Sequence, residues 1–153
     1  MIQEITNFNI RVYAIIFNED KTQILLSDEF QLGMQMTKFP GGGLKLGEGT
    51  IECLHREANE EFGQEIEIID HFYTTDFFQQ ALFYKDHQLI SIYYLARLKE
   101  KPAFKISTKI NDFEGKNGDQ SFRWILLKRL SVNDVTLPID KKVVSLLKKK
   151  FEV

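Results

Sequence analysis

The sequence predicts one α+β domain in which helices cover the two faces of a mixed β-sheet. Several segments alternate apolar and polar residues and are rich in β-branched and aromatic side chains, which is typical of strands. Two other segments repeat apolar residues with the period of a helix. The 153 residues have the length of one ordinary domain, and neither a repeat nor a linker divides them. We therefore expect residues 1–153 to form a single domain.

The first third of the chain predicts a hairpin followed by a glycine-rich turn. A strand is expected over residues 8–17, a polar turn over 18–21 and a partner strand over 22–27. Residues 30–37 are expected to form a loop. Pro40 and three successive glycines follow, and glycine allows a ligand to approach the main chain closely.

The remainder of the chain predicts two helices separated by strands. The clearest helix covers residues 50–62, with Thr50 as the predicted N-cap and Gly63 as the C-terminal stop. The other expected elements are strands over 66–73, 78–84, 89–98 and 122–127, a loop over most of 100–120, and a C-terminal helix over 139–151.

The acidic face of the first helix indicates a metal site. At about 100° per residue, Glu57, Glu60 and Glu61 share one face, beside an apolar stripe. Glu57 and Glu61 repel each other by a few tenths of a kcal/mol, and the helix dipole disfavours anions in the last turn. A divalent cation reverses both effects, and Mg²⁺ prefers carboxylate and phosphate oxygens. The apolar stripe consists of Ile51, Leu54, Ala58 and Phe62.

Arg56 and Glu48 are positioned to orient these acids. Arg56 lies one helical turn before Glu60, and its planar fork of donors can brace a glutamate while leaving other oxygens free. Glu48 precedes the helix and can reach the same guanidinium.

Residues 42–63 resemble the Nudix box. Its pattern is Gly, five residues, Glu, seven residues, Arg-Glu, an aliphatic residue, any residue, Glu-Glu, any residue, Gly and an aliphatic residue. One position departs, because Gln64 stands where the last aliphatic residue is expected; this concerns the start of the next strand and no metal ligand. The matching residues are Gly42, Glu48, Arg56, Glu57, Ala58, Glu60, Glu61 and Gly63.

The resemblance implies a fold and an activity. Nudix hydrolases share an α/β/α sandwich and cleave a nucleoside diphosphate linked to another group, using Mg²⁺ or Mn²⁺ bound by the box. A nucleoside triphosphate and a nucleotide sugar remain equally open as the small nucleotide substrate. The implied metal ligands are Glu57, Glu60, Glu61 and the carbonyl of Gly41 or Gly42. The implied catalytic residues are Glu57 (also a candidate base), Glu60 and Arg56, with Arg56 and Glu48 as the structural brace.

Residues outside the box carry weaker indications. The family often adds an acid from a later loop, and Glu114 and Asp119 are candidates, although solvated loop charges are the favoured interpretation of both. Arg11 and Arg97 are candidates for holding phosphate, with ordinary surface pairing favoured.

Charge and cysteine content limit the partners and the compartment. A net charge of −2 gives no positive field for a nucleic acid polymer. The single cysteine, Cys53, cannot form an internal disulfide, and no neighbouring histidine or lysine marks it as a nucleophile. Without a recognisable signal peptide or a membrane-spanning run, we expect a cytoplasmic protein with no membrane partner.

Two alternatives stay open. The competing function is a noncatalytic nucleotide-binding or sensing module on the same fold, against which the retention of every acid of the box speaks. A homodimer formed through the aromatic hairpin after the first helix is compatible with either function.

Overall fold

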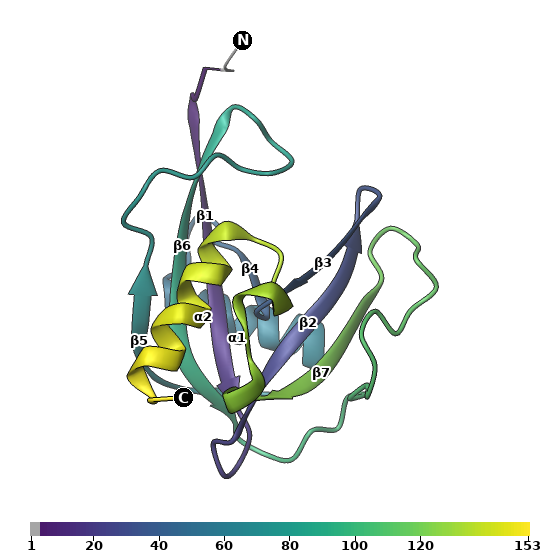
Figure 1. The fold of residues 1–153 in the computed structure, drawn as a ribbon. Coiled ribbons are helices and arrows are strands. Elements are labelled where there is room, and N and C mark those ends of the chain that lie inside the picture. The colour runs from purple at the N-terminus through teal and green to yellow at the C-terminus, as the bar shows by residue number, and fades with distance from the viewer. Residues whose placement is uncertain (1–3) are drawn as a thin grey trace.

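The computed structural model describes residues 4–153 as one mixed β-sheet with helices on both faces (Figure 1). Two short 3₁₀ turns, Leu127–Arg129 and Val132–Asp134, connect the last strand to the last helix. The strands and helices are β1 (Asn7–Phe17), β2 (Gln23–Gln31), β3 (Met34–Lys38), β4 (Gly41–Gly43), α1 (Thr50–Phe62), β5 (Ile66–Thr74), β6 (His87–Leu98), β7 (Gln120–Leu126) and α2 (Pro138–Lys150).

The sheet opens between β1 and β2. Its strand order is β3-β2-β1-β6-β5, with β4 paired to β1 and β7 paired to β2. β1 runs parallel to β6 over its whole length, whereas the other pairs are antiparallel. β1 meets β2 only at Phe17 and Ile24, so the two strands diverge from that point, as Figure 1 shows. The three glycines of β4 instead pair with Arg11–Tyr13 of β1.

Alternate residues of β1 point into two separate cores. Val12, Ala14 and Ile16 face α1, and the intervening residues face α2. From the helices, Leu54 and Phe62 of α1 fill the first core, and α2 fills the second with Val143, Val144 and Leu147. The predicted sandwich with a mixed sheet between helices is confirmed.

Two predicted elements were wrong. Residues 30–37 contain the end of β2 and most of β3, joined by a two-residue turn in which Leu32 (φ 48°) and Gly33 (φ 78°) are both left-handed. Residues 78–84 form a loop with one isolated bridge, between Gln80 and Gln88, instead of a strand. Because β6 already pairs with β1 and with β5 over most of its length, this aromatic segment finds little free strand edge.

Candidate active site

Local signals set the position and length of α1. Gly49 is the N-cap, one residue before the predicted Thr50, and its N–H donates to Oε1 of Glu52 (3.0 Å). Gly63 ends the helix in a left-handed conformation (φ 64°), as expected. The buried face differs from the predicted stripe at one end, because Ile51 is 44% exposed and Cys53 is buried instead. Burial raises the pKa of the Cys53 thiol to about 11, in keeping with a packing role.

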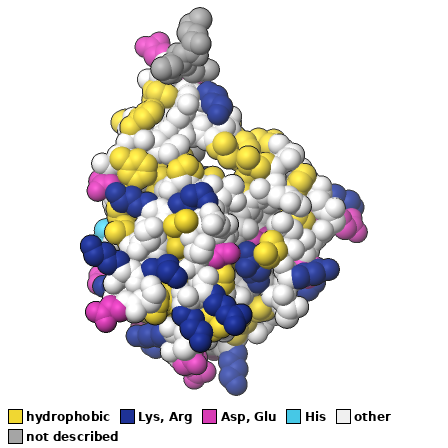
Figure 2. Space-filling view, viewed as in Figure 1, with side chains coloured by type: hydrophobic (Ala, Val, Ile, Leu, Met, Phe, Trp, Pro, Cys, Tyr) yellow, Lys and Arg dark blue, Asp and Glu magenta, His cyan; other side chains and the backbone are white. Residues whose placement is uncertain are grey.

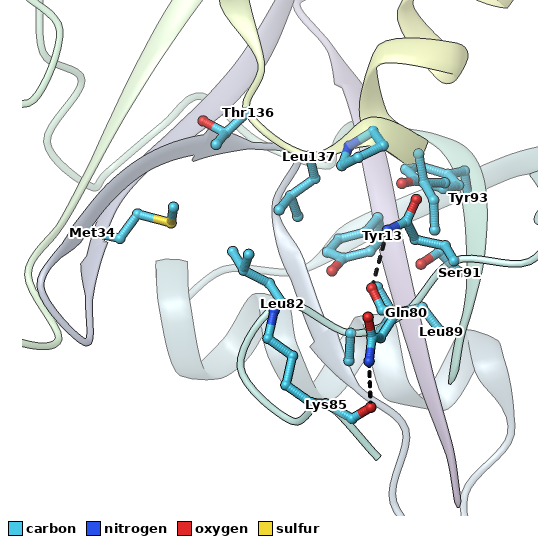
Figure 3. A pocket seen from close by; sticks show the side chains of 14 residues that line it. Tyr13, Met34, Gln80, Leu82, Lys85, Leu89, Ser91, Tyr93, Thr136 and Leu137 are labelled. Atoms are coloured by element: carbon cyan, nitrogen blue, oxygen red, sulfur yellow. Dashed lines mark hydrogen bonds between the residues drawn. The ribbon is translucent and has the colours of Figure 1, made fainter. Parts of the chain in front are cut away.

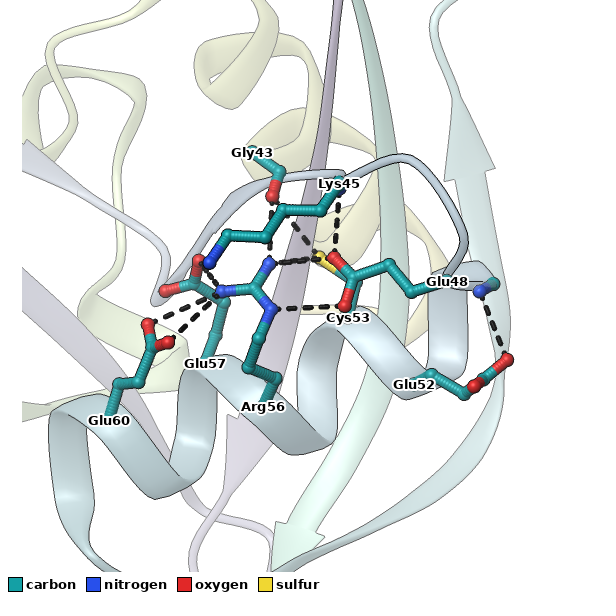
Figure 4. A network of polar contacts seen from close by, with 9 residues as sticks. Gly43, Lys45, Glu48, Glu52, Cys53, Arg56, Glu57 and Glu60 are labelled. Atoms are coloured by element: carbon teal, nitrogen blue, oxygen red, sulfur yellow. Dashed lines mark hydrogen bonds and ion pairs between the residues drawn. The ribbon is translucent and has the colours of Figure 1, made fainter.

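Arg56 is the centre of a polar network on this helix (Figure 4). Its Nε and one terminal nitrogen donate to the two carboxylate oxygens of Glu48 (3.0 and 2.7 Å). The other terminal nitrogen donates to Glu57 (3.0 Å) and approaches Glu60 (3.3 Å). Hydrogen bonding to Arg56 lowers the pKa of Glu48 to about 2 and raises that of Arg56 further above its usual value. The guanidinium therefore holds three carboxylates around the start of the acidic face.

The glycine strand lies against this network. One guanidinium nitrogen of Arg56 donates to the carbonyl of Gly43 (3.0 Å), which ties β4 to α1. A Cβ atom on Gly42 would overlap the carboxylate of Glu57. At Gly41, with φ 150°, a Cβ atom would overlap the main chain of β1. The absence of side chains here allows Glu57 to approach the main chain closely.

Within residues 4–153, Glu61 contacts β7 and not Arg56. Its Oε1 accepts from Gln120 on β7 (3.2 Å), whereas its buried Oε2 has no partner in the described part of the chain. Burial raises the pKa of Glu61 to about 7, although the positive charge of Lys38 acts in the opposite direction. A buried carboxylate oxygen without a donor is costly, so a bound cation or donor would stabilise it.

Sequence reasoning missed a buried charged cluster beside Glu61. Glu29 accepts from Ser27 (2.8 Å) and Gln120 (3.3 Å) and pairs with Lys38 (3.3 Å). These residues belong to β2, β3 and β7. Glu29 lies two and four residues after buried residues of β2, so continued strand alternation would have placed it on the same face. It was missed because the following segment was predicted to be a loop.

The donor set fits a hard divalent cation, although the carboxylates do not yet converge on one point. Within residues 4–153, no three acidic, histidine or cysteine side chains are arranged as a metal site. The oxygens of Glu57 and Glu60 are turned toward Arg56. Two features nevertheless fit a cation, namely the unpartnered oxygen of Glu61 and the close approach of the Glu57 carboxylate to the main chain of Gly42. Mg²⁺ and Mn²⁺ favour oxygen ligands of this type.

The two acids considered outside the box have partners in their own loop. Glu114 is exposed and pairs with Lys116 (3.1 Å). Asp119 accepts from the main-chain N–H groups of Gly115 (2.9 Å) and Lys116 (2.8 Å) and so stabilises its own turn. The later loop instead contributes Gln120, which contacts Glu61.

The structure separates the two arginines that the sequence could not distinguish. Arg97 forms an exposed pair with Glu67 (2.7 Å), the surface role favoured for it. Arg11 has no ion pair among the described residues; its Nε donates to the hydroxyl of Tyr13 (2.8 Å), and it lies beside Gly43. Tyr13 raises the pKa of Arg11 more than burial lowers it, and Glu29 and Glu57 also raise it.

A cavity of about 240 Å³ is lined in part by Tyr13 (Figure 3). It is bounded by β1, β6, the loop after β5 and the start of α2. Figure 2 shows hydrophobic side chains gathered on the upper part of the same face of the molecule. The lining residues are Tyr13, Met34, Gln79, Gln80, Ala81, Leu82, Lys85, Leu89, Ser91, Tyr93, Thr136, Leu137, Pro138 and Ile139.

Sequence comparison assigns the family. The family profile described as NUDIX domain matches residues 7–147, so the chain belongs to this family, as the resemblance predicted. The predicted enzyme class, a hydrolase of phosphoric anhydride bonds, is confirmed with it. No curated protein matches the sequence. No helix within residues 4–153 is long and apolar enough to cross a membrane.

Solved structures agree in fold. A NUDIX hydrolase from Nitrosomonas europaea has a TM-score of 0.68 and 18% identity, covering 94% of this chain and 90% of its own. A MutT from a study of Aliivibrio salmonicida and Vibrio cholerae has a TM-score of 0.65 and 22% identity, covering 95% and 100%. An ADP-ribose pyrophosphatase from Streptococcus suis has a TM-score of 0.58 and 19% identity, covering 95% and 92%. At these identities, the similarity shows the fold alone.

Proposed function

We propose that this chain is a divalent-metal-dependent hydrolase of the diphosphate bond in a nucleoside diphosphate linked to another group. A nucleoside triphosphate or a nucleotide sugar is the expected substrate. The observation that carries the proposal is the placement of Glu57, Glu60 and Glu61 on one helix, with the carboxylate of Glu57 directly against the main chain of Gly42. The names of the similar structures, which include a MutT and an ADP-ribose pyrophosphatase, support a nucleotide substrate.

Four groups of this chain would hold the cation. They are the carboxylates of Glu57, Glu60 and Glu61 and the carbonyl of Gly41, with Mg²⁺ or Mn²⁺ as the ion. When bound, the ion lowers the pKa of water and neutralises charge on the phosphoryl oxygens. Glu48 and Arg56 would brace this set, because the Glu48–Arg56 pair fixes the guanidinium that contacts Glu57.

The reaction requires a group that accepts a proton from the attacking water and a positively charged side chain that contacts the phosphate. Water attacks a phosphorus in line with the bridging oxygen, and the bond to that oxygen breaks. Glu57 is the proposed base that accepts the proton of this water. Arg11 has a guanidinium free of carboxylate partners within residues 4–153, beside the same strand, and we assign to it a contact with the substrate's phosphate.

The test is a substrate screen with a matched pair of variants. Nucleoside di- and triphosphates, nucleotide sugars and dinucleotides are supplied with Mg²⁺ or Mn²⁺, and the products identify the phosphorus attacked. Glu60→Gln should lower kcat by roughly two orders of magnitude or more while the thermal midpoint is unchanged. Glu52→Gln is the control, because glutamine can still accept from Gly49 N–H and the residue lies away from the acidic face.

Two results would contradict this function. Near-normal turnover by Glu60→Gln would reject the ligand assignment. Tight nucleotide binding without turnover of any compound would favour the noncatalytic binding module. The single domain over 1–153, the cytoplasmic location and a homodimer through the aromatic segment remain predictions.

A further inference from the structure

We infer that Gln120 is a positioning residue for the proposed cation site, because its amide holds one carboxylate oxygen of Glu61 and leaves the other oxygen free to bind the ion. This inference deepens the proposed function and rests on it, since it concerns how one of the proposed ligands is presented. Gln120 lies outside the box, at the start of β7, and no motif of the sequence points to it.

The amide of Gln120 reaches three oxygen atoms that come from two different elements. Its Nε2 lies 2.9 Å from Oγ of Ser27, 3.3 Å from Oε2 of Glu29 and 3.2 Å from Oε1 of Glu61. Ser27 and Glu29 belong to β2, whereas Glu61 belongs to the last turn of α1. One amide therefore forms a hydrogen-bonded link between the sheet and the acidic end of the helix.

The surrounding oxygens fix which end of this amide faces Glu61. The hydroxyl of Ser27 donates its own hydrogen to Glu29 (2.8 Å), so its oxygen accepts from Gln120. Ionised carboxylates only accept, so an amide turned the other way would bring its oxygen against those of Glu29 and Glu61. The NH₂ group is therefore the end that faces Glu61, and Gln120 acts on it as a hydrogen-bond donor.

A buried ion pair holds the other side of this link. Nζ of Lys38 lies 3.3 Å from Oε2 of Glu29, the same oxygen that accepts from Gln120, and the two charged side chains are only 6% and 10% exposed. Separating such a pair would leave a buried charge without compensation, so its geometry is maintained. Glu29 is therefore a fixed point in the sheet, to which Gln120 connects Glu61.

The two carboxylate oxygens of Glu61 consequently differ. Oε1 accepts from Gln120, whereas Oε2 is buried and has no partner within residues 4–153. An ion that binds Oε2 would meet a ligand whose orientation is already set, so binding would not include the entropy cost of ordering a glutamate side chain. A hydrogen bond from a neutral donor also favours the charged form of a carboxylate, which is the form that a cation binds.

The experiment measures Mn²⁺ binding without substrate, by the loss of the electron paramagnetic resonance signal of the free ion. Gln120→Met keeps the length of the side chain and removes the donor, so Mn²⁺ should bind about three- to tenfold more weakly. Gln64→Met is the control and should leave the affinity unchanged, because the amide of Gln64 donates to the carbonyl of Lys101 (2.9 Å) in the loop after β6. Gln120 is exposed, so its replacement should keep the thermal midpoint.

A double-mutant cycle tests whether Gln120 acts through Glu61. Glu61→Gln alone should weaken Mn²⁺ binding, and the addition of Gln120→Met should cause no further loss. An effect of Gln120 on the general structure would instead add to the effect of Glu61→Gln. In kinetics, Gln120→Met should raise the half-saturating Mg²⁺ concentration by the same factor while kcat at saturating Mg²⁺ stays within about twofold.

The outcomes separate this inference from the function. Unchanged Mn²⁺ binding by Gln120→Met, or the same loss with and without Glu61→Gln, would overturn the positioning role even if the enzyme hydrolyses diphosphates. Tighter binding by Gln120→Met would overturn it as well, because the amide would then compete with the ion for Glu61. Weaker binding that disappears in the Glu61→Gln background, together with a negative substrate screen, would retain the positioning role and reject the hydrolase.

Discussion

Glu61 couples the protonation state of the protein to its candidate metal site. Burial raises its pKa to about 7, so near neutral pH the proton and the cation compete for the same carboxylate. A raised pKa means that Glu61 stabilises the metal-free fold when protonated, and that this contribution is lost as pH rises through about 7. Metal binding has the opposite dependence, because it requires the ionised form.

We therefore expect the affinity for Mg²⁺ to increase as pH rises from 6 to 8. The measurement is the Mg²⁺ concentration that half-saturates the shift in thermal midpoint at each pH. Glu61→Gln should bind Mg²⁺ more weakly and lose most of this dependence. An affinity that is the same at pH 6 and pH 8 in the unmodified protein would exclude Glu61 as the responsible group.

Arg11 and Arg97 offer a comparison of two arginines on neighbouring strands. If Arg11 contacts phosphate, Arg11→Gln should raise KM about tenfold or more, since hydrogen bonds to charged groups are among the stronger ones. Arg97→Gln removes only an exposed pair with Glu67 and should change neither KM nor kcat. Steady-state kinetics on the substrate found in the screen measures both, and equal KM values would contradict the assignment.

At the scale of one element, β4 shows how closely the main chain must approach α1. A Cβ atom on Gly42 would overlap the carboxylate of Glu57, whereas a Cβ atom on Gly43 would meet its nearest neighbour, Arg11, at 3.7 Å. Gly42→Ala should therefore displace Glu57 and lower kcat at least tenfold, and Gly43→Ala should have little effect. Kinetics and thermal midpoints of the two variants provide the measurement; similar losses in both would show that β4, not Glu57, is disturbed.

Elements with local signals were predictable from sequence. Helix α1 was found within a residue at its start, because the glycine stop, the apolar repeat and the acidic residues are all local. β4 was not predictable as a strand, because glycine has little preference for strands and its pairing depends on β1, some 30 residues earlier. Residues 78–84 carry aromatic side chains typical of strands, but pairing is decided by a partner elsewhere in the chain.

In the candidate site, too, the residues that are close in sequence were predictable and those from separate strands were not. Glu48, Arg56 and the three glutamates could be named because they lie within 14 residues along and before one helix. Glu29, Lys38 and Gln120 come from three separate strands, and only the folded sheet brings them beside Glu61. The position of Arg11, which has no ion pair within residues 4–153, is likewise a consequence of strand pairing and cannot be read from its neighbours in sequence.

At the scale of the whole molecule, one buried hydrogen bond joins the sheet to the helix layer formed by α2. The carboxylate of Asp140 in α2 accepts from Tyr93 of β6, and its other oxygen has no partner within residues 4–153. Burial raises the pKa of Asp140 to about 6, partly offset by this hydrogen bond. The protein is therefore expected to lose stability as pH rises from about 4 to 6 through this group.

Removing the hydroxyl of Tyr93 should make the loss of stability with rising pH larger. Tyr93→Phe leaves the ionised carboxylate of Asp140 without its donor and should lower the free energy of unfolding by about 1–3 kcal/mol at pH 8. At pH 5, where the carboxyl is mostly protonated, the decrease should be smaller. Tyr94→Phe is the control, because its hydroxyl contacts Thr50 rather than an acid. Urea unfolding at both pH values measures the difference, and a decrease independent of pH would exclude Asp140 as its origin.

The bonds of Arg56 mean that the acidic helix carries its own counterion. The guanidinium pairs with Glu48, Glu57 and Glu60 and partly offsets their charge before any ion arrives, so we expect α1 to remain folded without a cation. Chelation with EDTA should abolish turnover while leaving the thermal midpoint within a few degrees, unlike a structural zinc domain, which unfolds. An ion would then bind to carboxylate oxygens that are already held in place, so its occupancy would follow the free Mg²⁺ concentration without refolding of α1.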